Sequence, residues 1–123
     1  MSNPDEPIHG VWQLLRAEFE GEQAPELVTT KTTLEITAGT YSVWFDGQVS
    51  DRGSFAKAES EVGGMIVLES TEGPNAGRTI RAIYQQKGDR LRVCYGLDGS
   101  VPTAFKAVSG APHYLATYRR TPR

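Results

Sequence analysis

The segment Tyr41-Ser42-Val43-Trp44-Phe45-Asp46-Gly47-Gln48-Val49-Ser50 contains the full sequence signature of a β-hairpin. Aromatic and β-branched residues, which fit the pleated surface of a strand, lie on both sides of Asp46-Gly47. Asp-Gly is favoured in two-residue turns whose central residues both have positive φ. The segment therefore predicts two antiparallel strands joined by a tight turn.

Segments of the same kind extend in both directions from this hairpin, and turn markers separate them. A second hairpin is predicted over residues 79–97, with its turn at Lys87-Gly88-Asp89. One short helix is expected at residues 25–28, because proline is tolerated in a first turn and Glu26 suits the helix dipole. The eight predicted strands are residues 11–19, 30–37, 41–45, 49–55, 65–69, 79–85, 91–97 and 114–119.

Eight sequential antiparallel strands must hide their two edges, and closing the sheet into a barrel removes both. We therefore predict an all-β fold: a small eight-stranded antiparallel up-and-down barrel with at most one short helix after the first strand. No repeat, linker or change in composition divides the chain. The barrel domain is assigned to residues 10–121, after a flexible N-terminus at residues 1–9.

The composition is that of one globular domain: 123 residues, 38% hydrophobic and 23% charged. The formal net charge of −2 provides no bulk attraction for nucleic acid, and no segment reaches the length of a membrane-spanning helix, so neither partner is expected. Cys94 is the only cysteine, which excludes an intramolecular disulfide. Because the first residues are acidic and proline-rich, no signal peptide is predicted and a cytoplasmic location is expected. A removed leader would leave no trace in this chain.

The two ends of the predicted barrel resemble a known pattern. Gly10-Val11-Trp12 in the first strand and Arg119-Arg120 in the last are similar to lipocalins and calycins, in which a late arginine covers a tryptophan. The chain more specifically resembles a bacterial lipocalin-like domain family that is frequent in planctomycetes. The matching segments are Gly10-x-Trp12, Glu18-x-x-Gly21, Asp51-Arg52-Gly53-Ser54-Phe55, residues 72–84, which begin Glu72-Gly73-Pro74, and residues 88–95, which end Val93-Cys94-Tyr95.

This resemblance implies a calycin-like barrel whose closed end is formed by Gly10, Trp12, Arg119 and Arg120. The chain departs from the family at residues 101–105, where an Arg-Pro pair usually precedes the phenylalanine and this chain has Val101-Pro102. Because the family has no established general activity, the resemblance implies architecture without chemistry.

Candidate ligand-binding residues belong to strands that could face a barrel interior: Trp12, Tyr84, Tyr95, Phe105 and Arg92. Two orientations of residues 91–95 are open, since a shift of one residue moves every side chain to the other face. We favour the apolar set Leu91, Val93 and Tyr95 facing inward, because burying an unpartnered arginine is unfavourable. Arg92 and Cys94 would then face outward, and the thiol would react promptly with a bulky reagent.

Other chemistries are not signalled. His9, His113 and Cys94 lack the spacing of a metal site, so no metal, haem or other cofactor is expected. No base is placed to activate Cys94, and no catalytic residue is assigned. The leading hypothesis is a non-enzymatic domain that binds a small apolar or amphipathic molecule, entering near residues 21–28. The alternatives are a filled barrel that acts as a structural or protein-interaction module, with a protein partner, and, with least support, a calycin-type enzyme using Tyr84, Arg92 and a carboxylate.

Overall fold

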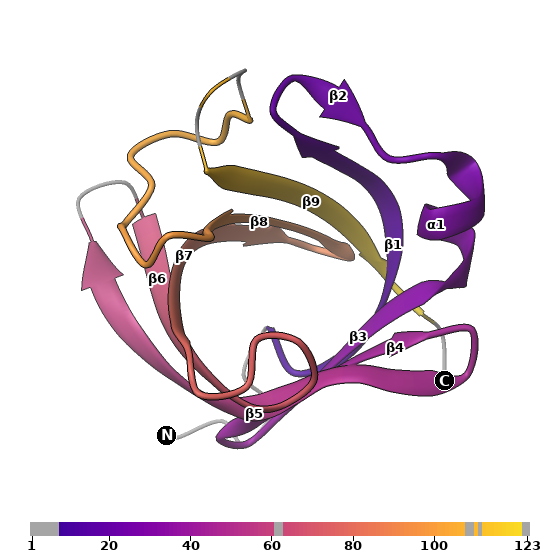
Figure 1. Ribbon diagram of the computed structural model, residues 1–123, viewed down its shortest axis with the longest axis horizontal. Coiled ribbons are helices and arrows are strands. Elements are labelled where there is room, and N and C mark those ends of the chain that lie inside the picture. Colours follow the sequence, from indigo (N-terminus) through magenta and orange to yellow (C-terminus); the bar gives the residue numbers. More distant parts are fainter. Residues whose placement is uncertain (1–7, 61–62, 108–109, 111, 122–123) are drawn as a thin grey trace.

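The computed structural model describes residues 8–60, 63–107, 110 and 112–121. The chain forms a closed barrel of eight antiparallel strands, with one additional two-residue strand and one short helix (Figure 1). The predicted fold class is therefore confirmed. The elements are β1 (Gly10–Phe19), β2 (Glu22–Gln23), α1 (Glu26–Lys31), β3 (Thr32–Thr37), β4 (Thr40–Phe45), β5 (Gln48–Ser60), β6 (Gly63–Glu72), β7 (Thr79–Lys87), β8 (Arg90–Gly96) and β9 (His113–Arg120).

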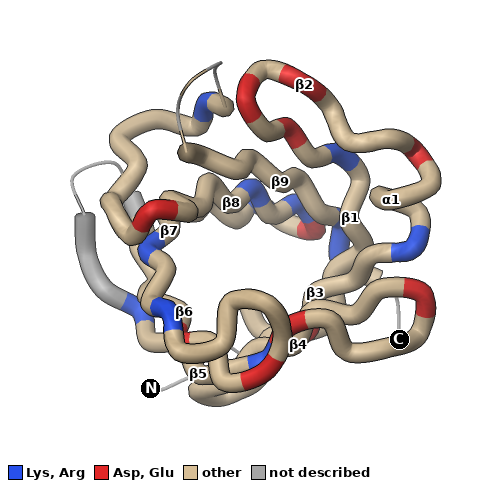
Figure 2. Tube along the Cα trace, in the orientation of Figure 1, with Lys and Arg blue, Asp and Glu red and all other residues tan. Residues whose placement is uncertain are grey.

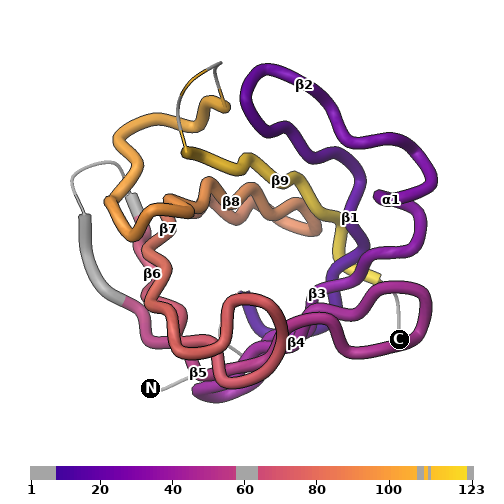
Figure 3. The backbone as a smooth tube through the Cα atoms, viewed as in Figure 1, coloured from indigo at the N-terminus to yellow at the C-terminus, as the bar shows by residue number. Residues whose placement is uncertain are grey.

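The barrel closes because β1 pairs with two strands. Its first four residues pair with β3, while residues 12–19 pair with β9 at the other end of the chain. Figure 3 shows the first and last strands side by side, where indigo meets yellow. All other pairs of barrel strands are neighbours in sequence, so the topology is up-and-down. Connections consequently alternate between the two ends of the barrel.

Both predicted hairpins form. Asp46 and Gly47 have φ values of 53° and 83°, as a turn with two positive-φ residues requires. In the second hairpin Lys87 pairs with Arg90, and Gly88 and Asp89 form the turn. Tyr84 faces Val93 across this ribbon and Tyr95 faces Ala82, which makes the two tyrosines diagonal neighbours.

Most strand boundaries differ from the prediction by one or two residues, β6 ends three residues later than predicted, and the short strand β2 was not predicted. Two further differences have a clear structural cause. Residues 30 and 31 belong to α1 rather than to a strand, and the Thr30 hydroxyl donates to the Glu26 carbonyl at 2.6 Å. Strand β5 extends to Ser60, five residues further than predicted, because it continues to pair with β6. Its last residues, Ala-Lys-Ala-Glu-Ser, have low strand propensity, so local sequence does not signal this extension. The described part of the chain contains no helix that is long and apolar enough to cross a membrane.

A tryptophan closes one end of the barrel. Trp12 is fully buried, and the Arg120 guanidinium lies 4.3 Å from the centre of its ring. The indole Nε1 donates to the Ile8 carbonyl at 3.0 Å, and Arg120 Nη1 donates to the His9 carbonyl at 2.6 Å. The predicted stacking of an arginine on Trp12 is therefore present, with Arg120 in that position.

The other two residues predicted at this end, Arg119 and Gly10, have opposite outcomes. Arg119 does not take part, since its side chain is exposed on the strand position next to Arg120. Gly10 does take part, because a Cβ there would lie 2.7 Å from Arg120 Nη1. Residues 1–7 of the predicted flexible N-terminus lie outside the described residues. Ile8 is 2% exposed and packs in the core, so this residue belongs to the barrel and not to a flexible segment.

Candidate ligand-binding cavity

The barrel encloses a cavity of about 300 Å³. The cavity is lined by inward-facing residues of strands β3 to β9, and most of these residues are apolar. No residue of β1 is among the lining residues that the structure describes. The aliphatic lining consists of Ile8, Leu34, Ile36, Val43, Ile66, Leu68, Ile80, Leu91, Val93 and Leu97, and the aromatic lining of Tyr41, Phe55, Tyr84, Tyr95, Tyr114 and Tyr118. This volume lies at the lower end of the range for small-molecule sites, about 300–1,000 Å³.

The cavity is closed at one end and reaches the loops at the other. Lining residues near Trp12, such as Ile8 and Leu91, are buried, whereas Asn75 and Leu97 are half-buried on the loops of the opposite end. The β6–β7 loop curls across this mouth in Figure 1. The β1–β3 connection, where ligand entry was predicted, lies at the same end.

Arg78 ties the β6–β7 loop to the end of β8. Its Nη2 donates to the carbonyl of Leu97, and its Nη1 donates to Asn75 Oδ1 at 3.4 Å. Leu97, Asn75 and the adjacent Pro74 all line the cavity. The Arg78 side chain is exposed, so it forms a bridge at the rim of the mouth rather than part of the core.

A single carboxylate, Asp51, lies in this mostly apolar lining. A β-bulge positions it: Val43 pairs with Asp51 and Trp44 with Val49, which leaves Ser50 as the extra residue of β5. Both Ser50 and Asp51 consequently line the cavity. Bulges redirect side chains in this way and are frequent beside functional sites. Among the described lining residues, Asp51 alone has a charged side chain.

Three neutral groups donate hydrogen bonds to the Asp51 carboxylate. The Ser70 hydroxyl donates to Oδ1 at 2.6 Å and the Tyr41 hydroxyl to the same oxygen at 3.2 Å. The Asn75 amide donates to Oδ2 at 3.4 Å, which is long. A carboxylate has about four acceptor sites, so Oδ2 retains capacity for a further donor.

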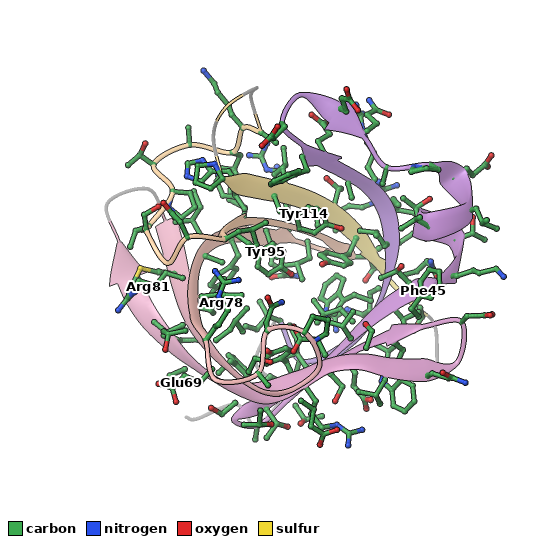
Figure 4. The ribbon with its side chains drawn as sticks, in the orientation of Figure 1. Phe45, Glu69, Arg78, Arg81, Tyr95 and Tyr114 are labelled. Atoms are coloured by element: carbon green, nitrogen blue, oxygen red, sulfur yellow. The ribbon has the colours of Figure 1, made fainter. Side chains whose placement is uncertain are left out.

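Three tyrosines form a second polar group in the cavity. The hydroxyl oxygens of Tyr95 and Tyr118 are 2.9 Å apart, and the rings of Tyr95 and Tyr114 have centres 5.7 Å apart (Figure 4). Burial raises the pKa of all three phenols. Burial, followed by the nearby Asp51 carboxylate, also raises the pKa of Tyr41 to about 12. These hydroxyls are therefore neutral near pH 7 and can both donate and accept.

The predicted site residues divide between the two faces of the barrel. Tyr84 and Tyr95 line the cavity, and the inward orientation of Leu91, Val93 and Tyr95 is confirmed. Trp12 forms the closed end and is not among the lining residues. The placement of Phe105 and Arg92 in the cavity is wrong: they contact each other outside, with the guanidinium 4.1 Å from the ring centre. In Figure 4, Arg81 and Glu69 likewise lie outside the ring of strands.

Cys94 faces outward as predicted, but it is not accessible. Its exposed fraction is 0%, because residues from the β8–β9 connection cover this part of the outer face. The thiol donates to the carbonyl of Lys106 at 3.6 Å, and Pro102 and Ala107 of the same connection are buried as well. Burial raises the pKa of the Cys94 thiol. This burial argues against the expected prompt reaction with a bulky reagent.

The residues that the sequence suggested for enzymatic chemistry do not assemble. Tyr84 lies in the cavity and Arg92 on the outer face, so these two do not meet with a carboxylate. Within the described ranges, no group of three or more His, Cys, Asp or Glu side chains could hold a metal ion. The arrangement offers instead an enclosed apolar volume with hydrogen-bonding groups at a few positions.

Sequence reasoning missed Asp51, Tyr41, Tyr114 and Tyr118 as lining residues. One signal was present: counting back in steps of two from Phe55 passes Gly53 and reaches Asp51, which places an acid on the inward face of that strand. The sequence places the three tyrosines on strands but does not show on which face of its strand each one lies. Their inward direction follows from strand pairing with residues distant in sequence.

Comparison with protein-family models, with curated proteins and with solved structures finds no match for this chain. The class of the protein therefore rests on its own architecture. It is a closed eight-stranded up-and-down β-barrel with an internal cavity.

Proposed function

We propose that this protein is a non-enzymatic, lipocalin-like binding domain that holds one small apolar or amphipathic molecule in its barrel. The observation that carries this proposal is the cavity of about 300 Å³, with an apolar wall and a few convergent polar groups. Small-molecule sites are built in this way. A barrel serving only as a structural or interaction module would have its interior filled by side chains.

The size of the cavity limits the ligand. An apolar cavity of about 150 Å³ accepts one benzene molecule. The cavity of this barrel is about twice as large, which fits a molecule with one aromatic ring and a short polar chain, or a compact aliphatic of similar bulk. Its apolar part would lie against Leu68 and Ile80, and its polar part near Tyr95 and Asp51.

The closed end supports the same proposal. Trp12 and Arg120 close the barrel on one side, so we expect a ligand to enter at the other end, where the β6–β7 loop and its Arg78 bridge lie. This combination of a tryptophan-arginine floor and an open mouth is what the resemblance to lipocalin-like domains implies.

Native mass spectrometry of the protein purified from its own host tests the proposal, because it detects a retained ligand and a retained protein partner together. We expect a single bound small molecule. Val43→Phe, which adds volume to the lining, should abolish retention. The matched control is Val67→Phe on β6, whose side chain lies between the inward-facing Ile66 and Leu68 and faces outward. Retention by Val43→Phe equal to that of the control, or a bound protein without a small ligand, would refute the proposal.

A further inference from the structure

Asp51, the one charged side chain among the described residues that line the cavity, bears on the class of ligand. We infer that the barrel binds a small organic cation: a protonated amine on an apolar or aromatic body, with its ammonium group against Asp51. This inference rests on the proposed function, since it names the ligand class of the same cavity.

The first argument is the unbalanced charge of Asp51. Its three hydrogen-bond donors are Tyr41, Ser70 and Asn75, all neutral. Across the described residues, no lysine or arginine forms an ion pair with it. A carboxylate beside an apolar cavity loses hydration, and an opposite charge compensates for that loss. A ligand ammonium would supply the missing cation and donate to the available position on Oδ2.

The second argument is the aromatic character of the surrounding wall. Tyr41 contacts Asp51 directly, and Tyr95 is near enough that the carboxylate adds to the burial that raises the pKa of its phenol. Tyr114 packs against Tyr95 at the same end. Aromatic faces attract ammonium groups through the ring quadrupole, and the interaction is strongest where water is excluded. One carboxylate among aromatic rings is thus suited to an amine.

The third argument is the charge around the mouth. The segment from Glu18 to Lys31, which connects β1 and β3 at this end, contains four glutamates and one lysine. Figure 2 shows these acidic positions gathered along the β1 end, β2 and α1. Glu20, Glu22 and Glu26 are exposed and form no ion pair with any described residue. Such a rim raises the local concentration of cations and speeds their encounter with the site.

Arg78 is the cation that a ligand amine would pass. Its guanidinium is directed to the Leu97 carbonyl and to Asn75 Oδ1, while the Asn75 amide nitrogen donates to Asp51. The asparagine therefore separates the two charges. Because Arg78 is exposed at the rim, water screens it far more than the cavity wall screens Asp51.

Titration calorimetry with three probes of similar size tests the inference: 2-phenylethylamine, 2-phenylethanol and 3-phenylpropionate, which are cationic, neutral and anionic near pH 7. The wild-type protein should bind the amine about tenfold or more tightly than the alcohol, because charge-assisted hydrogen bonds are stronger than neutral ones. 3-Phenylpropionate, the anionic probe, should bind most weakly.

Asp51→Asn should remove the preference for the amine while keeping the affinity for the alcohol within a few-fold. Asp46→Asn is the matched control, because it makes the same charge change at the same end of the barrel, at a side chain 66% exposed. Asparagine also preserves the turn there. The control should keep the preference, and thermal melting of both variants checks their folding.

The outcomes separate the two proposals. If 2-phenylethanol or 3-phenylpropionate binds to the wild-type protein as tightly as the amine does, the cavity is a binding site and the cation inference is wrong. An amine preference that Asp51→Asn retains in a folded protein also refutes it. If none of the three probes binds and the host-purified protein carries no small molecule, both the inference and the proposed function fail. The probe comparison on the wild-type protein decides the inference even if Asp51→Asn does not fold.

Discussion

Replacement of Trp12 by alanine should remove much of the stability of the barrel. The side chain is 0% exposed, its Nε1 donates to the Ile8 carbonyl, and Arg120 covers its ring. Tryptophan-to-alanine changes in a core lower the free energy of unfolding by about 3–5 kcal/mol. The lost indole hydrogen bond accounts for about 1 kcal/mol of this and the cation–π contact for about 0.5–2 kcal/mol. The free energy of unfolding of a native domain is about 5–15 kcal/mol in total, so the variant would be only marginally stable.

Urea unfolding followed by far-ultraviolet circular dichroism measures this effect. With a urea dependence of about 2 kcal/mol per molar, a loss of 4 kcal/mol lowers the midpoint by about 2 M. Trp44→Ala is the control, since Trp44 is half-buried and lies outside the cavity lining on β4. We expect it to lower the free energy of unfolding by less than about 2 kcal/mol. A Trp12→Ala variant within about 0.5 kcal/mol of wild type would show that the closed end does not depend on this side chain.

Three further predictions concern the outer face, the cavity tyrosines and the closed end. Cys94 should resist a bulky thiol reagent in the native protein, as measured by intact mass. Phe105→Ala should accelerate labelling, and fast labelling of the wild-type protein would contradict the burial of the thiol. Stability should fall as pH rises from about 10 to 12, because unfolded Tyr41 loses its proton near 10 and the folded residue near 12. The melting temperature should fall less over this pH range in Tyr41→Phe than in wild type. If it falls equally with pH in both proteins, Tyr41 is not the group responsible. Gly10→Ala should lower the melting temperature more than Gly39→Ala: both have positive φ, but only at Gly10 does a Cβ meet another residue; equal changes would exclude that contact.

Much of the fold follows from local chemistry. The turn at Asp46-Gly47 needs two residues that tolerate positive φ, and the sequence provides them next to each other. The alternation of Leu91, Val93 and Tyr95 with polar neighbours correctly predicts which face of β8 lines the interior. The contact between Trp12 and a late arginine, in contrast, was implied by the resemblance to lipocalins and calycins, and only the contact geometry distinguishes Arg120 from Arg119.

The candidate site could be predicted only in part. Tyr84 and Tyr95 were assigned correctly to the interior, whereas Arg92 and Phe105 form their own contact outside. Asp51 was not selected: counting back from Phe55 places it on the inward face, but the bulge at Ser50, which breaks the alternation with the start of β5, has no local signal. An extra residue in one strand changes the face of every residue beyond it, and this shift is defined only relative to the partner strand.

The sequence by itself determined the number of barrel strands, the sharp turns and the inward-facing residues of β8. Strand periodicity and turn conformation depend on residues within a few positions of one another. Tertiary structure alone decided that Cys94 is buried on an outward face and which residues of β1 pair with β3 and which with β9. It also decided that one carboxylate lies inside an otherwise uncharged cavity lining. These features arise from contacts between segments far apart in the chain. Side-chain alternation along one strand does not specify which distant segment covers a given face of that strand.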